Sequence, residues 1–132
     1  MVDVCMPCEI EAFGITGKNN VTEAVLNLSE RMKGGLAMIK NGKNGVFYEL
    51  PDGEKKVRHL SAFPVKDIVD TTGAGSAFNA GFLREWTKCK KFDAVSVERA
   101  IKKGCAAAKL AVLELGPFIE NVTADLVDRI FD

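Results

Sequence analysis

A run of small residues is the segment of this 132-residue sequence whose residue types and spacing most directly suggest chemistry. It extends from Asp70 to Ser76 and leads into residues with helical spacing. Gly73, Ala74 and Gly75 carry almost no side chain, so the backbone can approach an oxygen-rich ligand closely. The first turn of the following helix presents backbone N–H groups that have no acceptor inside the helix. The segment therefore predicts a cradle for a phosphate group.

A bare Gly-x-Gly element is weak evidence, because such a turn also lets a helix pack closely against a sheet. The longer string from Asp70 to Leu83 is more specific, since small and aromatic residues follow the glycines along the helix. This string closely resembles the second signature of the ribokinase family of carbohydrate kinases, the phosphofructokinase-B group. The resemblance implies that Gly73, Ala74 and Gly75 form an anion hole for the γ-phosphoryl group of ATP.

The residue after the second glycine departs from the family pattern. The resemblance implies an aspartate base there, acting on the substrate hydroxyl, whereas this sequence has Ser76. An unassisted serine hydroxyl is a poor base at neutral pH, and general-base catalysis contributes about 10²–10⁴ in rate. A serine nucleophile would need an activating base, and the single histidine, His59, falls on an expected strand, where a structural or exposed role is favoured. Ser76 therefore predicts a site that holds a nucleotide without using it efficiently.

Two further matches extend the resemblance toward the start of the chain. The segment Pro7 to Glu11 is similar to the family's Asn-x-x-Glu motif, with Cys8 in the Asn position, and implies that Glu11 organises water around Mg²⁺. Gly42 and Gly45 lie in a turn similar to the family's Gly-x-x-Gly turn beside the nucleotide. Ordinary roles stay open for these residues: helix capping or solvation for Glu11, and a plain turn for the two glycines.

The resemblance implies two further groups of contacts. Asp70 and Thr72 occupy positions that bind the cofactor and, in several relatives, a monovalent cation such as K⁺ near the anion hole. A helix beginning near Asp93 resembles the family helix along the adenine pocket, which makes Lys103 and Ala107 candidate nucleotide-binding residues. Small residues on such a helix equally favour close packing of one helix against another.

The elements that must position these residues follow from the hydrophobic pattern. Asn20 and Glu23 suggest an N-terminal capping box, and Asp93 suggests the cap of a long helix that ends at Gly116-Pro117. Turn signals around residues 41–45 and 51–53 predict a hairpin or meander in the middle of the chain. The expected strands are 2–6, 36–39, 46–50 and 56–63, and the expected helices begin near 21, 77, 93 and 123. Strands mixed with helices indicate the α/β class.

Cys5-Met6-Pro7-Cys8 raises a competing hypothesis. Its C-x-P-C spacing is typical of thiol oxidoreductases, in which a reactive thiolate lies at a helix N-terminus. The polar, glycine-containing stretch after Cys8 gives no sign of a long helix there, which argues against this hypothesis. Cys89 and Cys105 form no second C-x-x-C for a zinc site. All four cysteines are expected to be thiols.

Composition excludes several other classes. Hydrophobic residues make up 47% and charged residues 27% of the chain, which predicts a folded protein with one core. Eighteen basic and eighteen acidic side chains cancel, so recruitment of nucleic acid or an anionic membrane by net charge is not expected. No long apolar segment and no secretory leader pattern is found in the sequence, which predicts a cytoplasmic protein.

The expected protein is a three-layer α/β/α ribokinase-like fold, limited to its C-terminal, nucleotide-binding part over residues 1–132. Family members are roughly twice this length, and the resemblance implies that the sugar or nucleoside pocket and lid lie in a half that this chain lacks. Its expected reaction is ATP- and Mg²⁺-dependent phosphoryl transfer to a sugar or nucleoside hydroxyl, weak or absent in this chain alone. A nucleotide-binding pseudo-enzyme or scaffold is the alternative. An open sheet edge also predicts a homo-oligomer.

Overall fold

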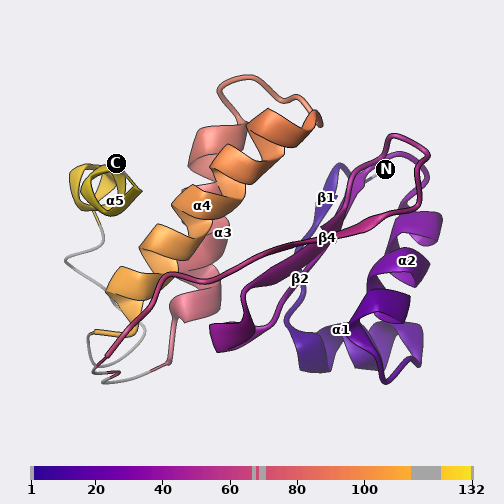
Figure 1. The fold of residues 1–132 in the computed structure, drawn as a ribbon, viewed down its shortest axis with the longest axis horizontal. Helices are drawn as coiled ribbons and strands as arrows, with labels where there is room; N and C mark the ends of the chain where they lie inside the picture. Colours follow the sequence, from indigo (N-terminus) through magenta and orange to yellow (C-terminus); the bar gives the residue numbers. More distant parts are fainter. Residues whose placement is uncertain (1, 67, 69–70, 114–122, 132) are drawn as a thin grey trace. The chain divides into compact units, whose positions relative to one another are not determined.

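The computed structural model describes residues 2–66, 68, 71–113 and 123–131, and these fall into two compact units (Figure 1). The first unit comprises Met1–Ser61 with Phe92–Ala94, and the second comprises Ala62–Lys91 with Val95–Asp132. The length predicts one core, whereas each unit buries a hydrophobic cluster of its own.

A four-stranded mixed sheet organises the first unit, in the order β1-β2-β3-β4. Strand β1 pairs in parallel with β2, whereas β3 and β4 add as an antiparallel meander (Figure 1). The parallel pair requires a long crossover, and helices α1 and α2 provide it. The elements are β1 (Val4–Cys5), α1 (Glu9–Thr16), α2 (Val21–Met32), β2 (Leu36–Lys40), the 3₁₀ turn η1 (Gly42–Asn44), β3 (Val46–Glu49) and β4 (Val57–Leu60). The predicted meander is confirmed, and the two edge strands of the sheet, β1 and β4, are shorter than the expected 2–6 and 56–63.

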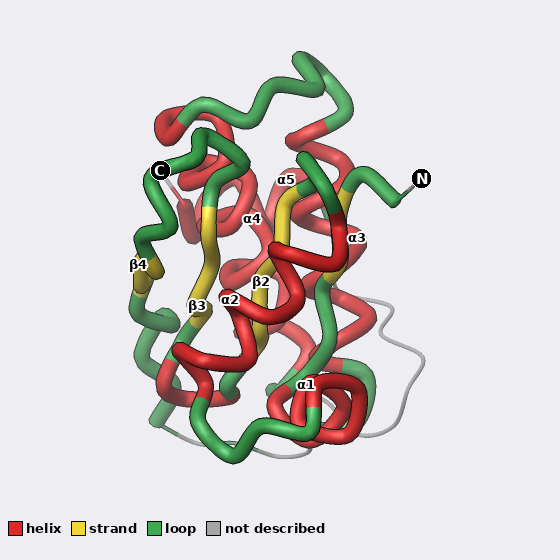
Figure 2. Tube along the Cα trace, turned by 90° about the vertical axis from the view of Figure 1, so that its right-hand side faces the viewer, coloured by secondary structure: helices red, strands yellow, loops and turns green. Residues whose placement is uncertain are grey.

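Helix α2 supplies most of the helical side of this unit's core. Its buried residues Ala24, Val25 and Leu28 recur at helical spacing and pack with Ala37 and Ile39 of β2. Figure 2 shows α2 running alongside β2 and β3. Complete burial of an aliphatic side chain of this size contributes about 1.5–3 kcal/mol, so this face anchors the helix to the sheet.

The cap of α2 is at Asn20, the position that the sequence predicts. The Asn20 side chain accepts a hydrogen bond from the Glu23 N–H at 3.1 Å. The helix then ends at Lys33, whose backbone is left-handed (φ 52°), just before the Gly34-Gly35 pair that was expected to stop it. Capping of this kind contributes about 1 kcal/mol.

Helix α1, of eight residues, was not among the expected helices; the sequence had indicated only that no long helix follows Cys8. The Glu11 side chain accepts a hydrogen bond from the Cys8 N–H at 2.9 Å, which caps the helix at its start. Gly17 ends it in a left-handed conformation (φ 69°) and donates its N–H to the Phe13 carbonyl. The helix buries Ala12 and Thr16 alone, so its sequence lacks the amphipathic repeat that would have revealed it.

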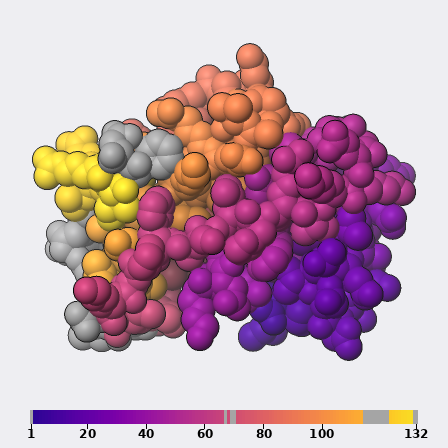
Figure 3. Space-filling view, in the orientation of Figure 1, coloured from indigo at the N-terminus to yellow at the C-terminus, as the bar shows by residue number. Residues whose placement is uncertain are grey.

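Three helices form the second unit: α3 (Ala74–Trp86), α4 (Ala94–Ala111, with Ala94 itself in the first unit) and α5 (Ala124–Phe131). Their shared cluster contains Ala77, Ala106, Ala107, Ala111 and Val127. The predicted helix near residue 123 is confirmed, and its yellow atoms are visible at the surface in Figure 3. The predicted end of α4 at Gly116-Pro117 lies outside the described residues.

The α/β class is confirmed by the mixed sheet and its helices. No helix within the described ranges combines the length and apolar character needed to cross a membrane.

Helices α3 and α4 approach so closely that two glycines are required at their contact. A Cβ on Gly81 would lie 2.7 Å from the Lys103 carbonyl oxygen and 2.9 Å from the Ala107 Cβ. A Cβ on Gly104 would lie 2.8 Å from two carbons of the Phe78 ring. The obstacle at Gly81 includes backbone, which cannot rotate away as a flexible side chain can.

We predict that Gly81→Ala lowers the free energy of unfolding by about 1–3 kcal/mol, because the added methyl group forces α3 and α4 apart. Urea denaturation measures this change. Gly14→Ala in α1 is the matched control: nothing lies within 4 Å of its Cβ position, so better helix propensity should raise the stability by about 0.5–1 kcal/mol. Equal effects of the two substitutions would contradict the close contact.

Candidate active site

The N-terminus of α3 carries the predicted phosphate cradle. Gly73 is its cap residue, with a left-handed backbone (φ 85°, ψ −8°) that glycine adopts without steric cost. The Ala74 N–H donates to the Thr71 carbonyl at 3.2 Å, and the Ala77 N–H donates to the Gly73 carbonyl at 2.9 Å. A tight turn therefore leads directly into the helix.

Gly75 and Ser76 belong to the first turn of α3, because the helix begins at Ala74 rather than near residue 77 as the sequence pattern suggests. Both residues are exposed. Helix geometry gives their N–H groups no acceptor inside the helix, and the helix dipole favours an anion there by about 0.3–1 kcal/mol, or up to about 2 kcal/mol when partly buried. The geometry fits an incoming phosphate group.

The neighbours of this turn are only partly described. Thr72 is exposed, directly before Gly73. Asp70 lies outside the described residues, so its roles toward the nucleotide and a monovalent cation stay predictions.

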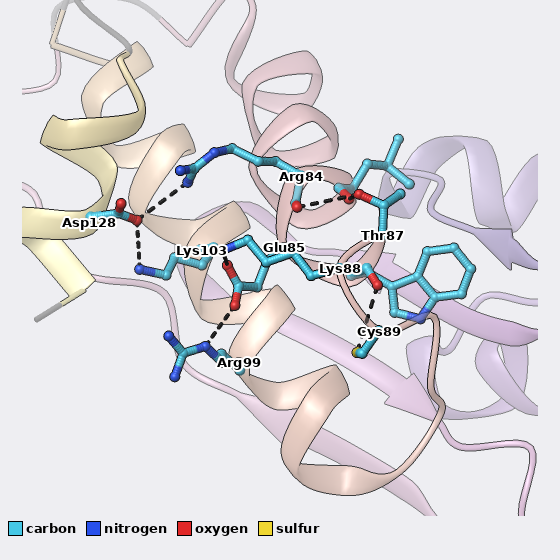
Figure 4. A network of polar contacts seen from close by, with 10 residues as sticks. Arg84, Glu85, Thr87, Lys88, Cys89, Arg99, Lys103 and Asp128 are labelled. Carbon is cyan, nitrogen blue, oxygen red and sulfur yellow. Dashed lines mark hydrogen bonds and ion pairs between the residues drawn. The ribbon is translucent and has the colours of Figure 1, made fainter.

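Lys103 and Ala107 lie in the same unit as the cradle, but their side chains are engaged in packing. Lys103 is 3% exposed, and its Nζ donates to Asp128 Oδ1 of α5 at 2.8 Å (Figure 4). Ala107 is 1% exposed and packs against Gly81. The structure thus shows close helix packing on this face of α4, and a nucleotide contact by either residue stays a prediction.

Asp128 is a key polar residue that sequence reasoning missed. Its Oδ1 also lies 3.4 Å from Arg84 Nη1, so it links α5 to both α3 and α4 (Figure 4). The hydrogen bonds from Lys103 and then Arg84 hold the pKa of this carboxyl below its usual value. No local sequence signal could have revealed a contact between Lys103 and a residue so far along the chain.

A second ionic cluster lies beside it. Glu85, which is 7% exposed, accepts hydrogen bonds from Arg99 Nε and Lys88 Nζ, each at 2.7 Å (Figure 4). Glu85 thus links the end of α3 to α4, and its buried carboxylate is compensated by two positive charges.

Gly42 and Gly45 form a tight turn in the first unit. Their φ angles are 51° and 87°, and the Asn41 N–H donates to the Gly45 carbonyl at 2.8 Å. His59 Nε2 is hydrogen-bonded to the Asn44 carbonyl oxygen, and its ring lies 4.5 Å from the Phe47 ring. The histidine therefore supports the turn, as its expected structural role implies, and the nucleotide contact of the glycines stays a prediction.

Glu11 caps α1 and remains ionised. Hydrogen bonds to Cys8 lower the pKa of its carboxyl, and the Lys40 charge lowers it further. An ionised, exposed carboxylate has the chemistry that Mg²⁺ prefers when it retains water, so the residue fits the predicted role through water. Across residues 2–66, 68, 71–113 and 123–131, no group of three His, Cys, Asp or Glu side chains is arranged to hold a metal ion.

The thiol hypothesis is weakened by the surroundings of its cysteines. All four cysteines are free thiols, as predicted. Cys8 does lie at a helix N-terminus, but burial raises the pKa of Cys5, which is opposite to the shift of an activated thiolate. Burial also raises the pKa of Cys105 to about 11.

The comparisons with known proteins concern the family and the fold of the chain. Residues 1–123 match the model of the pfkB family of carbohydrate kinases. Ribokinase from Haemophilus influenzae is 36% identical over 120 residues, which cover 88% of this chain and 36% of the relative. Cytidine kinase from Thermococcus kodakarensis is 34% identical over 117 residues, covering 87% of this chain and 38% of the relative.

A solved structure extends the comparison to the fold. Fructokinase from Vibrio cholerae O395, in a form with bound fructose, ADP and calcium ion, superposes with a TM-score of 0.84. The match covers 98% of this chain and 41% of that one, at 22% identity.

The fold and the sequence match together define a chain of the ribokinase-like class. More specifically, the chain belongs to the pfkB family of carbohydrate kinases, and it spans about two fifths of the length of the relatives described above.

We predict that Asp128→Asn loosens α5, because it leaves the buried ammonium group of Lys103 without its counter-charge. Faster hydrogen exchange of the α5 amides and a lower thermal midpoint are expected at neutral pH. Because the folded pKa of Asp128 is depressed, its contribution is present above about pH 4 and is lost as the pH falls through the folded value.

Asp125→Asn is the control, since Asp125 is an exposed residue of the same helix. Equal effects of the two substitutions, or an Asp128→Asn effect that persists unchanged in acid, would contradict the ionic link.

Proposed function

We propose that this chain is the nucleotide-binding part of a phosphotransferase, which transfers the γ-phosphoryl group of ATP to a sugar or nucleoside hydroxyl. The observation that carries the proposal is the N-terminus of α3, where a left-handed glycine cap precedes two exposed first-turn residues, Gly75 and Ser76. Membership of the pfkB family supports it, as does the ADP bound in the related fructokinase structure.

In this proposal the α3 N-terminus stabilises charge on the transferred group. The N–H groups of Gly75 and Ser76 donate to the γ-phosphoryl oxygens, and the helix dipole adds to their field. Such transfer depends mainly on positioning and electrostatic stabilisation. When bound, Mg²⁺ would neutralise phosphate charge, and Glu11 would hold one of its waters. Thr72, with Asp70, would bind the nucleotide and a monovalent cation.

The proposed substrate site lies largely in the part of the relatives' length that this chain does not span. The chain spans 36% of the ribokinase and 38% of the cytidine kinase. We therefore propose that sugar or nucleoside binding needs the remaining family segments, and that the chain forms homo-oligomers through an open edge of its sheet.

Ser76 supports a second candidate function. It occupies the position of the aspartate base that the resemblance implies. The single histidine of the chain, His59, is hydrogen-bonded to the Asn44 carbonyl oxygen. A chain that keeps the phosphate cradle without this base would bind ATP as a scaffold or regulatory module and turn it over weakly.

We expect Gly75→Asp to abolish binding of MgATP, because a carboxylate in the first turn repels the phosphates while remaining compatible with the helix dipole. Isothermal titration calorimetry measures the binding, and circular dichroism checks the fold. Ala80→Asp is the matched control, since it adds the same charge at an exposed position farther along α3. Absence of MgATP binding by the unaltered chain would refute both candidate functions.

We expect Ser76→Asp to raise sugar-dependent release of ADP by about 10²–10⁴ when the segments that complete the family fold are supplied. A coupled assay for ADP measures the rate, and Ser76→Asn serves as a control of similar shape without a basic carboxylate. MgATP binding with no gain in rate from Ser76→Asp would favour the scaffold over the kinase.

A further inference from the structure

A cavity is found in the first unit, at the end of the sheet opposite to the Gly42–Asn44 turn. Its volume is about 300 Å³, and it lies between the end of α2, the end of β3 and the connection to β4. The antiparallel register places Glu49 opposite Ala37 near the start of β2, whereas the turn joins Lys40 to Val46. This cavity therefore has no residue in common with the candidate nucleotide site.

A buried carboxyl group forms part of the cavity wall. Glu49 is 5% exposed, and its Oε2 has no hydrogen-bond partner among the described residues. The pKa of this carboxyl is raised above its usual value, mainly because the group is buried. The nearby charges of Asp52 and Glu30 raise the pKa further, whereas a hydrogen bond from Ser29 and the charge of Lys55 oppose the shift. Buried polar atoms are normally paired, so this oxygen can accept a hydrogen bond from a ligand donor.

The other polar side chains around the cavity restrict what that donor can be. Lys33 and Lys55 also line it, as do Ser29 and Glu30. Two ammonium groups disfavour a bare cation, whereas two carboxylates disfavour a simple anion. A ligand that carries both a positive and a negative group satisfies both requirements.

The remaining wall is apolar. Leu26, Leu50 and Pro51 line the cavity, and Leu50 is 4% exposed. The volume lies at the lower end of the range for small-molecule sites. An aliphatic group of a few carbons fits this wall, whereas a nucleotide would exceed the space.

We propose that this cavity binds an aliphatic α-amino acid. The ammonium group of the ligand donates to Glu49, its carboxylate binds Lys33 and Lys55, and its side chain packs on Leu26 and Leu50. The terminal torsion of a glutamate side chain is soft, so Glu49 can turn an oxygen toward the ligand. Binding here is independent of the proposed kinase function, because the two sites have no residue in common.

Titration of the full 132-residue chain with L-leucine tests the proposal, with the amide shifts of Ser29, Gly34 and Gly53 as the readout. We expect saturable shifts with a dissociation constant in about the millimolar range. N-acetyl-leucine lacks the ammonium group and leucine amide lacks the carboxylate, so each should bind at least about tenfold more weakly. Equal binding of all three compounds, or no saturable shift at about 20 mM leucine, would overturn the proposal.

Glu49→Gln tests the ammonium contact. It keeps the side-chain shape and removes the charge, so leucine should bind about tenfold more weakly while N-acetyl-leucine is unaffected. Glu54→Gln is the matched control, since Glu54 lies in the same β3–β4 connection and is exposed. Unchanged leucine binding by Glu49→Gln would show that Glu49 does not bind the ammonium group of leucine, and it would refute the site as proposed.

Discussion

The close contact of α3 with α4 at Gly81 and Gly104 is the constraint on which the second unit depends. A side chain at Gly81 would meet backbone atoms of α4, so the two helices can pack in this way only with hydrogen at that position. This contact fixes α3 against α4, and α3 in turn carries the Gly73 cap and the first-turn amides at its N-terminus. The candidate site is therefore held by packing that begins farther along the same helix.

Charge pairs add orientation to this packing. Asp128 connects α5 to Lys103 and Arg84, and Glu85 connects α3 to Arg99 of α4. Lys103 is almost fully buried, so its ion pair with Asp128 avoids the large cost of an isolated charge. The same pairing explains why a lysine that resembles a nucleotide contact in sequence is directed toward α5 in the structure.

The sequence predicted those elements whose signals are local and periodic. The cap at Asn20, the amphipathic face of α2 and the β2–β3–β4 meander were all foreseen, because each rests on spacing or turn residues within a few positions. Helix α1 was missed because it buries few residues and contains Gly14, so its sequence shows no amphipathic repeat. The capping contact between Glu11 and Cys8 is the main feature that marks its start. Contacts such as Lys103 with Asp128 join positions that no local pattern relates.

By itself, the sequence identified the family and predicted an anion-binding loop, because the small residues before a helix and the serine at position 76 are facts of residue type. The tertiary structure decided the start of α3 at Ala74, the packing role of Ala107 and the ion pair of Lys103. It also decided that Glu49 is enclosed beside a cavity. The reason is physical: residue type sets which interactions are available, whereas burial and distance, which arise only when remote segments pack, select those that form.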